Sequence, residues 1–121
     1  MVDAEFEAVP EFPKELKKLS RKYKSLNEDF EKFRTVLTIT LPNHTPGTFE
    51  ISDLGANVKT PIYKVKHFRY RDFRGKGSRS GFRIIYAHMQ NSEKIIFIEI
   101  YHKNNKSNHD VERIKKYFEE L

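Results

Sequence analysis

The 121-residue sequence contains no cysteine and no tryptophan. Without cysteine the chain can form no disulfide and can bind no metal through thiolates, and this composition fits the reducing cytoplasm. The sequence also has no apolar run as long as a membrane-spanning helix needs. Its first seven residues carry three acids instead of the apolar segment of a signal peptide. We therefore expect a cytoplasmic protein with no membrane partner.

Motifs for metal ions and nucleotide cofactors are missing as well. The acidic residues do not cluster with histidines at the spacing of metal ligands. The segment 75–77, Gly-Lys-Gly, is no phosphate-binding loop, because it lies in a connection between two expected strands and not between a strand and a helix. We expect neither a metal nor a cofactor.

Positive charge is what the sequence has in excess. Lys and Arg total 23 against 17 Asp and Glu, which gives a formal net charge of +6. Such a balance favours polyanionic partners, usually nucleic acid, because binding releases counterions. The length is that of one domain, and we expect residues 1–121 to form a single one.

The first half of the chain predicts a strand and two helices. Residues 4–9 alternate apolar and acidic side chains, as a half-buried strand does. Apolar residues then recur at helical spacing over 13–23 and again over 27–37, which indicates an antiparallel helical hairpin. Proline and glycine punctuate residues 38–61, which we expect to form a long surface loop, with room for a short strand at 37–41.

The second half predicts three strands, at residues 62–68, 82–88 and 95–101, and a last helix at 109–121. The third strand is nearly all apolar, so we place it inside the sheet. The expected fold class is α+β, with the N-terminal strand and the helical hairpin packed on a small antiparallel sheet, followed by a C-terminal helix.

The positive charge is concentrated in one stretch. Nine basic residues and a single acid lie between Lys59 and Arg83, with aromatic residues interleaved. Basic side chains hold phosphates, and aromatic rings stack on unpaired bases. For the aromatics, packing in the core is the simpler interpretation, because alternation buries half of any strand. For the charges we favour binding, since such one-sided charge costs self-repulsion.

Two motifs in this stretch resemble a known family. Residues 63–66, Tyr-Lys-Val-Lys, followed by residues 80–86, Ser-Gly-Phe-Arg-Ile-Ile-Tyr, are similar to the paired strand signatures of the RelE/ParE toxins. Phe97 and Lys103 fall where that pattern expects them, and Leu54-Gly55 resembles the loop before the first of these strands. The order of elements agrees along nearly the whole chain.

The resemblance implies a toxin of a type II toxin-antitoxin system with a RelE-like fold. RelE-like members cleave mRNA, typically on the ribosome and without metal. ParE-like members share the fold but inhibit DNA gyrase. Both are neutralised by a cognate antitoxin, so the implied partners are an antitoxin, mRNA and the ribosome.

Carried over residue by residue, the basic trio of the RelE-type catalytic face is Lys64, Lys66 and Arg83. At the position of a further arginine of that site, this sequence has Asn104. The position of a tyrosine in the family's last helix falls near Asp110, so that tyrosine has no counterpart here. Other RNase members use a tyrosine or histidine at the end of the last strand, which Tyr101-His102 resembles. The predicted catalytic residues are therefore Lys64, Lys66, Arg83, Tyr101 and His102, and the predicted RNA-binding residues are Arg69, Arg71, Arg74, Lys76, Arg79 and Lys103.

Metal-free RNA cleavage needs a base for the attacking 2′-OH, positive charge for the phosphorane and an acid for the 5′ oxygen. Arg83 suits the charge role, because its guanidinium can hold two phosphate oxygens. Lys64 and Lys66 lie two apart and share a strand face, where they stabilise the phosphorane or supply a base. His102 has the best intrinsic pKa for an acid or base, and Tyr101 positions the phosphate or stacks on a base.

We expect the remaining histidines to be structural or to lie at the protein surface. We expect His44 and His88 at the surface and His67 packed on the far side of the sheet. We expect His109 at the start of the last helix, within reach of the site. Two alternatives stay open beside the endoribonuclease: a ParE-like gyrase inhibitor that acts by protein binding, and a non-catalytic nucleic-acid-binding domain of the same fold.

Overall fold

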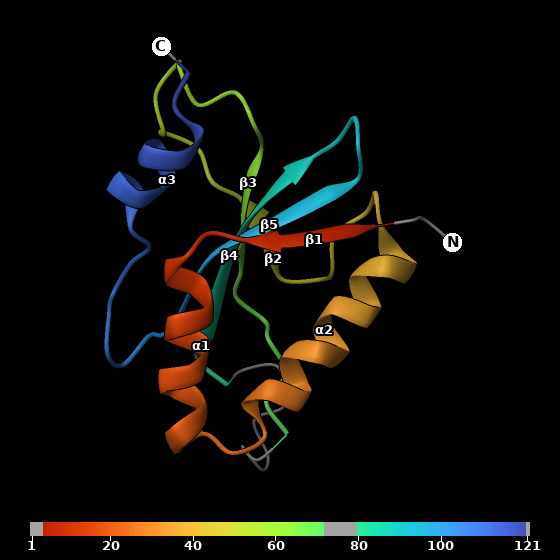
Figure 1. Cartoon of the computed structure of the whole chain (residues 1–121), viewed down its shortest axis with the longest axis vertical. Helices are drawn as coiled ribbons and strands as arrows, with labels where there is room; N and C mark the ends of the chain where they lie inside the picture. Colours follow the sequence, from red (N-terminus) through yellow and green to blue (C-terminus); the bar gives the residue numbers. More distant parts are fainter. Residues whose placement is uncertain (1–3, 72–79, 121) are drawn as a thin grey trace.

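The computed structural model describes residues 4–71 and 80–120 (Figure 1). It has three helices and five strands, so the α+β class is confirmed. Along the chain these are β1 (Glu5–Ala8), α1 (Glu11–Lys22), α2 (Leu26–Thr40), β2 (Thr48–Glu50), β3 (Ile62–Val65), β4 (Phe82–Met89), β5 (Lys94–His102) and α3 (Val111–Phe118).

The strands form one mixed sheet in the order β1-β5-β4-β3-β2. The pairs β2–β3, β3–β4 and β4–β5 are antiparallel. The pair β1–β5 is parallel, with Phe6 opposite Ile95. The prediction of an antiparallel sheet was therefore wrong in this one pairing. A parallel neighbour can lie far away in sequence, and the pairing of the first strand with the last leaves no local sequence pattern. Strand β5 lies inside the sheet, as its apolar sequence predicts.

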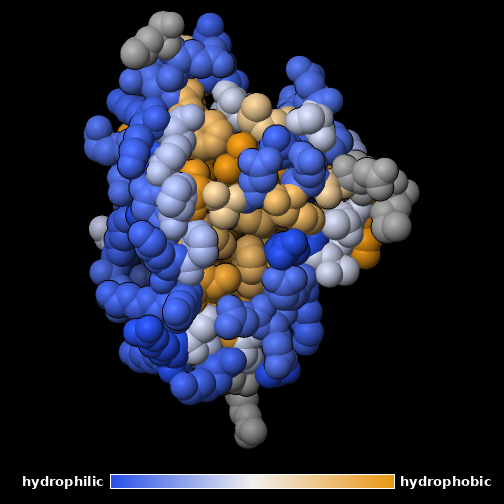
Figure 2. Space-filling view, viewed as in Figure 1, coloured by the Kyte–Doolittle hydropathy of each residue, from blue (hydrophilic) through white to orange (hydrophobic). Residues whose placement is uncertain are grey.

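Helices α1 and α2 cover one side of the sheet, which we call the helical face (Figure 1). Phe12 of α1 and Phe30 of α2 contact Phe97 of β5, with ring centroids 5.3 and 4.9 Å apart. Figure 2 shows apolar side chains gathered between the two helices and hydrophilic residues around them. Burial of these aromatic rings stabilises the fold, because each removes a large apolar surface from water.

Helix α3 is fixed to α1 and to β5. Arg113 donates to both carboxylate oxygens of Glu15, at 2.9 and 2.8 Å, and to the Ile98 carbonyl at 2.9 Å. The Tyr117 hydroxyl donates to Glu11 at 2.6 Å. These contacts hold the last helix beside the sheet.

No helix within residues 4–71 and 80–120 is both long and apolar enough to cross a membrane.

The segment 37–61 departs from the prediction. Helix α2 continues to Thr40, so no strand forms at residues 37–41. Leu37 and Leu41 are both buried, and helical spacing brings both to the core, which outweighs the strand propensity of the residues between them. The following segment is not all loop, because it contains the three-residue strand β2, paired with β3. A strand this short leaves little alternation to recognise.

The register between β4 and β5 changes at one point. Ile85 is opposite Glu99, but the next pair is Tyr86 with Phe97, so Ile98 is the extra residue of a β-bulge. Tyr86 and Phe97 both contact aromatic rings on the helical face. Ile85 and Glu99 therefore turn to the opposite face of the sheet.

Three histidine predictions were wrong. His88 is buried, with 1% of its surface exposed, and His44 is half-buried, its ring stacked 3.8 Å from that of Tyr63. The loop after α2 folds back over β3 and β4, which covers both rings. His67, expected to be packed, is exposed, because β3 ends at Val65 and its alternation does not extend that far.

Candidate functional site

Four of the five predicted catalytic residues lie together on the side of the sheet opposite α1 and α2. Arg83 of β4 is paired with Tyr101 of β5, and its Nη1 donates to the Lys66 carbonyl at 3.1 Å. The Lys64 ammonium group lies 5.9 Å from the centroid of the Tyr101 ring. Residues paired across strands share a face of the sheet. We call Lys64, Lys66, Arg83 and Tyr101 the basic face.

Lys64 contacts two polar side chains from the segment before α3. Its Nζ donates to Asn108 Oδ1 at 3.1 Å and lies 3.3 Å from His109 Nδ1. Partial burial lowers the pKa of Lys64, and the positive charges of Lys66 and Arg83 lower it further, against the opposing effect of Glu99. A lysine in this setting releases its proton more readily than a solvated one.

His109 therefore belongs to the site, although sequence reasoning gave it a role at the helix start. That role falls to Asp110, whose side chain accepts the Arg113 N–H at 3.0 Å. Burial lowers the pKa of His109, and the charge of Lys64 lowers it further, so the imidazole is neutral at pH 7. The neutral ring presents a proton acceptor beside Lys64.

A buried carboxylate holds this arrangement in place. Glu99 has 1% of its surface exposed, accepts the Asp110 N–H at 2.8 Å through Oε1 and forms an ion pair with Lys106 through Oε2. Both partners belong to the segment between β5 and α3 that carries Asn108 and His109. One signal in the sequence was an acid inside an otherwise apolar strand, and sequence reasoning did not use it.

Tyr101 lies beneath the two lysine side chains. Its ring centroid is 5.9 Å from Lys64 Nζ and 5.5 Å from Lys106 Nζ, within the range of cation–π attraction. Burial raises the pKa of Tyr101 to about 12, with a smaller contribution from Glu99 and an opposing one from Arg83. Its buried hydroxyl has no hydrogen-bond partner in the described part of the chain. The phenol is therefore protonated at neutral pH and cannot act as a base there.

The structure does not bring His102 to the basic face. Its ring lies on the helical face, 5.8 Å from the Tyr23 ring and 4.9 Å from the Phe82 ring. Nε2 donates to the Ser80 carbonyl at 3.0 Å, and Nδ1 accepts the Asn104 N–H at 3.1 Å. Both ring nitrogens thus bind backbone groups, and burial lowers the pKa of His102.

The predicted RNA-binding residues are spread more widely. Arg69 and Lys103 are exposed. Arg71 forms an ion pair with Glu28 of α2 at 2.8 Å, and its backbone N–H donates to Asp29. Its side chain therefore lies toward the helices. The other three predicted residues, Arg74, Lys76 and Arg79, lie outside the described residues.

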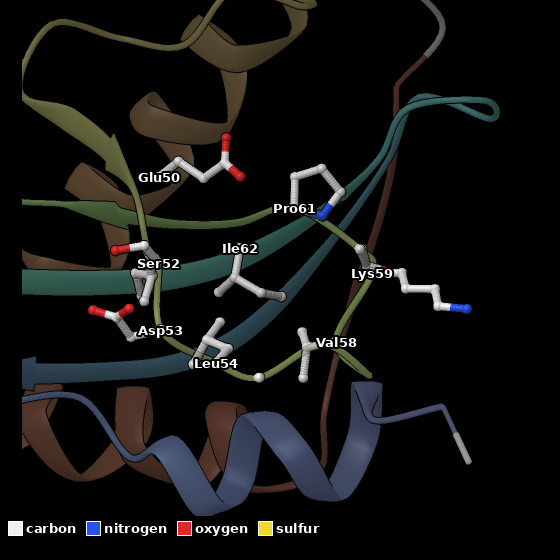
Figure 3. A pocket seen from close by; sticks show the side chains of 11 residues that line it. Glu50, Ser52, Asp53, Leu54, Val58, Lys59, Pro61 and Ile62 are labelled. Carbon is white, nitrogen blue, oxygen red and sulfur yellow. The ribbon is translucent and has the colours of Figure 1, made fainter.

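A hollow beside β3 is lined by residues 50–55 and 58–62 (Figure 3). Leu54, Val58 and Ile62 line it with apolar side chains, and the Lys59 ammonium group points out of it toward Glu120, at 3.7 Å. Val58 also bridges to Glu119 after α3. These contacts connect the loop to the residues that follow α3.

Among residues 4–71 and 80–120, no group of three or more histidine and acidic side chains is placed to hold a metal ion. Comparison of the sequence with models of known protein families found no match, and no curated protein matched it.

Proposed function

We propose that this protein is a RelE-like toxin that cleaves mRNA on the ribosome by metal-free phosphoryl transfer. The observation that carries the proposal is the convergence of three cations, a neutral histidine and a tyrosine on one face of the sheet. Lys64, Arg83 and Tyr101 come from three strands, Lys66 directly follows the strand of Lys64, and His109 reaches them from the segment before α3. The resemblance of the strand motifs to the RelE/ParE toxins supports the same reaction.

The first chemical role in the proposed reaction is that of the base. The pair formed by His109 and Lys64 accepts the proton of the 2′-OH, which then attacks the adjacent phosphorus. Both groups have a lowered pKa, so their proton-accepting forms are more populated at neutral pH than those of the free side chains.

The remaining roles are electrostatic stabilisation and protonation of the leaving group. Arg83 and Lys66 stabilise the negative charge that develops on the phosphorane oxygens. Lys66 is exposed beside Arg83, and its ammonium group protonates the 5′ oxygen as the P–O5′ bond breaks. The products are one RNA end with a 2′,3′-cyclic phosphate and one with a 5′-hydroxyl.

Regulation follows from the same proposal. An enzyme that cuts the mRNA of its own cell requires neutralisation, and the family resemblance implies a cognate antitoxin. The proposed place of action is the cytoplasm, where translating ribosomes are found.

Induced expression of the chain alone, followed by primer extension on cellular mRNAs, tests the proposal. We expect growth arrest with discrete cuts inside translated regions, and we expect Arg83→Ala to abolish both. The matched control is Arg21→Ala, which removes an exposed arginine from α1 on the other side of the sheet. Arrest with intact mRNA and broken DNA would instead favour a gyrase inhibitor, and no arrest would favour a non-catalytic nucleic-acid-binding domain.

A further inference from the structure

Phe49 of β2 is a large aromatic side chain left in solvent, with 54% of its surface exposed. The other large apolar side chains exposed in the described part of the chain are the aliphatic Val36, Ile39 and Met89. Phe49 lies on an edge strand, paired directly with Lys64 of β3. Because paired residues share a face, the ring lies on the same side of the sheet as the basic face.

The surroundings of Phe49 are those of a nucleic-acid contact. The Lys66 ammonium group lies 5.6 Å from the centroid of the ring. Two strand spacings, roughly 10 Å, separate β2 from β4, the strand that carries Arg83. A ring at this distance from a phosphate-binding guanidinium is within reach of the nucleotides next to that phosphate.

The exposure of the ring has no structural explanation in the fold. A core role would require burial. In β3, Val65 on the helical face and Ile62 on the face shared with Phe49 are buried at 0% and 1% exposure, but the Phe49 ring is left uncovered. An exposed ring beside a cation offers one stacking surface and one charge, the two features with which proteins hold single-stranded nucleic acid.

We propose that Phe49 is a stacking platform for an unpaired base of single-stranded RNA bound next to the basic face, with Lys66 holding the neighbouring phosphate. Its position relative to the cut phosphate rests on the proposed function, but the stacking itself does not. The platform favours substrates whose bases are free to splay out of a helix, and it accepts any of the four bases because each has an aromatic face.

The absence of tryptophan from the chain allows a direct test, because Phe49→Trp creates a single fluorescent reporter at the platform. The probe is a single-stranded RNA oligonucleotide with 2′-O-methyl groups, which cannot be cut by its own 2′-oxygens. The matched control is Ile39→Trp, at a position on α2 with 69% exposure. We expect saturable quenching of Phe49→Trp, weaker quenching by an oligonucleotide with abasic positions, and none in Ile39→Trp.

Binding measurements on non-fluorescent variants complete the test. Phe49→Ala should weaken RNA binding about fivefold to a hundredfold, while Phe49→Tyr should bind like the wild type. Thermal unfolding should be nearly unchanged in Phe49→Ala, because the ring is exposed. Wild-type binding by Phe49→Ala, or RNA binding without quenching of Phe49→Trp, would overturn the proposal even if the protein cleaves RNA. If RNA quenches Phe49→Trp but neither the wild type nor any variant cleaves mRNA, the stacking platform is supported and the proposed enzymatic activity is refuted.

Discussion

The Nζ of Lys64 lies 3.3 Å from Nδ1 of His109, a residue 45 positions further along the chain. Strand β3 carries the lysine, and the segment that Glu99 fixes to β5 carries the histidine. Burial lowers the pKa of both groups, and the positive charge of Lys64 lowers that of His109 further. This proximity turns a basic surface into a site with a group that can accept a proton at neutral pH.

Removal of His109 should impair cleavage while leaving RNA binding intact. We expect His109→Ala to slow single-turnover cleavage by about 10²–10⁴-fold, the usual contribution of a general base. The dissociation constant for uncleavable RNA should change little, since the proposed phosphate contacts are those of Lys66 and Arg83. His67→Ala, at an exposed histidine, is the control, and equal rates for the two variants would exclude His109 from the reaction.

The pKa of His109 should depend on Lys64. We expect NMR titration to give a pKa below the ordinary value near 6.5 in the wild type, and a higher one in Lys64→Met, because a neighbouring positive charge disfavours the imidazolium. On the acidic side of the pH profile, cleavage by the wild type should accordingly fall only below the ordinary histidine pKa. If the pKa of His109 is the same in Lys64→Met, the two groups do not interact in solution.

Glu99 should act by positioning, since it touches the segment that carries His109 and not the basic face itself. Glu99→Ala loses the Asp110 hydrogen bond and the Lys106 ion pair, and we expect a loss of about 1–3 kcal/mol in the free energy of unfolding. The ion pair contributes little to this loss, because solvent screens the Lys106 side chain, which is 40% exposed. Glu99→Gln keeps an acceptor for the Asp110 N–H and should recover part of both stability and cleavage, as denaturant titration and rate measurements will show.

His102 should contribute to stability and not to the reaction. His102→Ala removes two hydrogen bonds to the backbone and a buried ring, which should cost about 2–4 kcal/mol. Folded His102→Ala should still cleave RNA at a temperature well below its melting point. A cleavage defect as large as that of Arg83→Ala in fully folded protein would return His102 to the catalytic set.

His102 should also affect how the free energy of unfolding depends on pH. The pKa of His102 is lower in the folded protein than in the unfolded chain, chiefly because of burial, so the unfolded state binds the proton more readily. The stability that this site contributes is complete above pH 6.5 and is lost as the pH falls through the folded-state pKa. His44 and His109 act in the same direction, and His102→Ala should make the decline of unfolding free energy below pH 6.5 less steep.

The sequence was most informative where its pattern is local. The three strands of the C-terminal half show alternation and β-branched residues, and Lys64 and Lys66 share a face simply because they lie two apart. The parallel pairing of β1 with β5, the short strand β2 and the bulge at Ile98 depend on contacts between distant residues, so no local pattern predicts them.

The candidate site likewise combines features that a local sequence pattern predicts with features that depend on distant contacts. Tyr101 and His102 are neighbours in one strand, so only one of them can face the basic residues, and the structure assigns that place to Tyr101. His109 could not be placed with certainty from the sequence, because its position depends on Glu99 anchoring the segment before α3.

The central claim is that the 2′-OH of the RNA is the nucleophile, activated on the basic face without a metal. The most direct test is cleavage of a ribosome-bound mRNA in which one 2′-deoxynucleotide replaces the ribonucleotide on the 5′ side of the mapped cut. We predict that this single change abolishes cleavage at that position, while the unmodified mRNA gives a 2′,3′-cyclic phosphate and a 5′-hydroxyl end. Cleavage of the deoxy-substituted mRNA at the wild-type rate would contradict the account, because water and not the 2′-OH would then be the nucleophile.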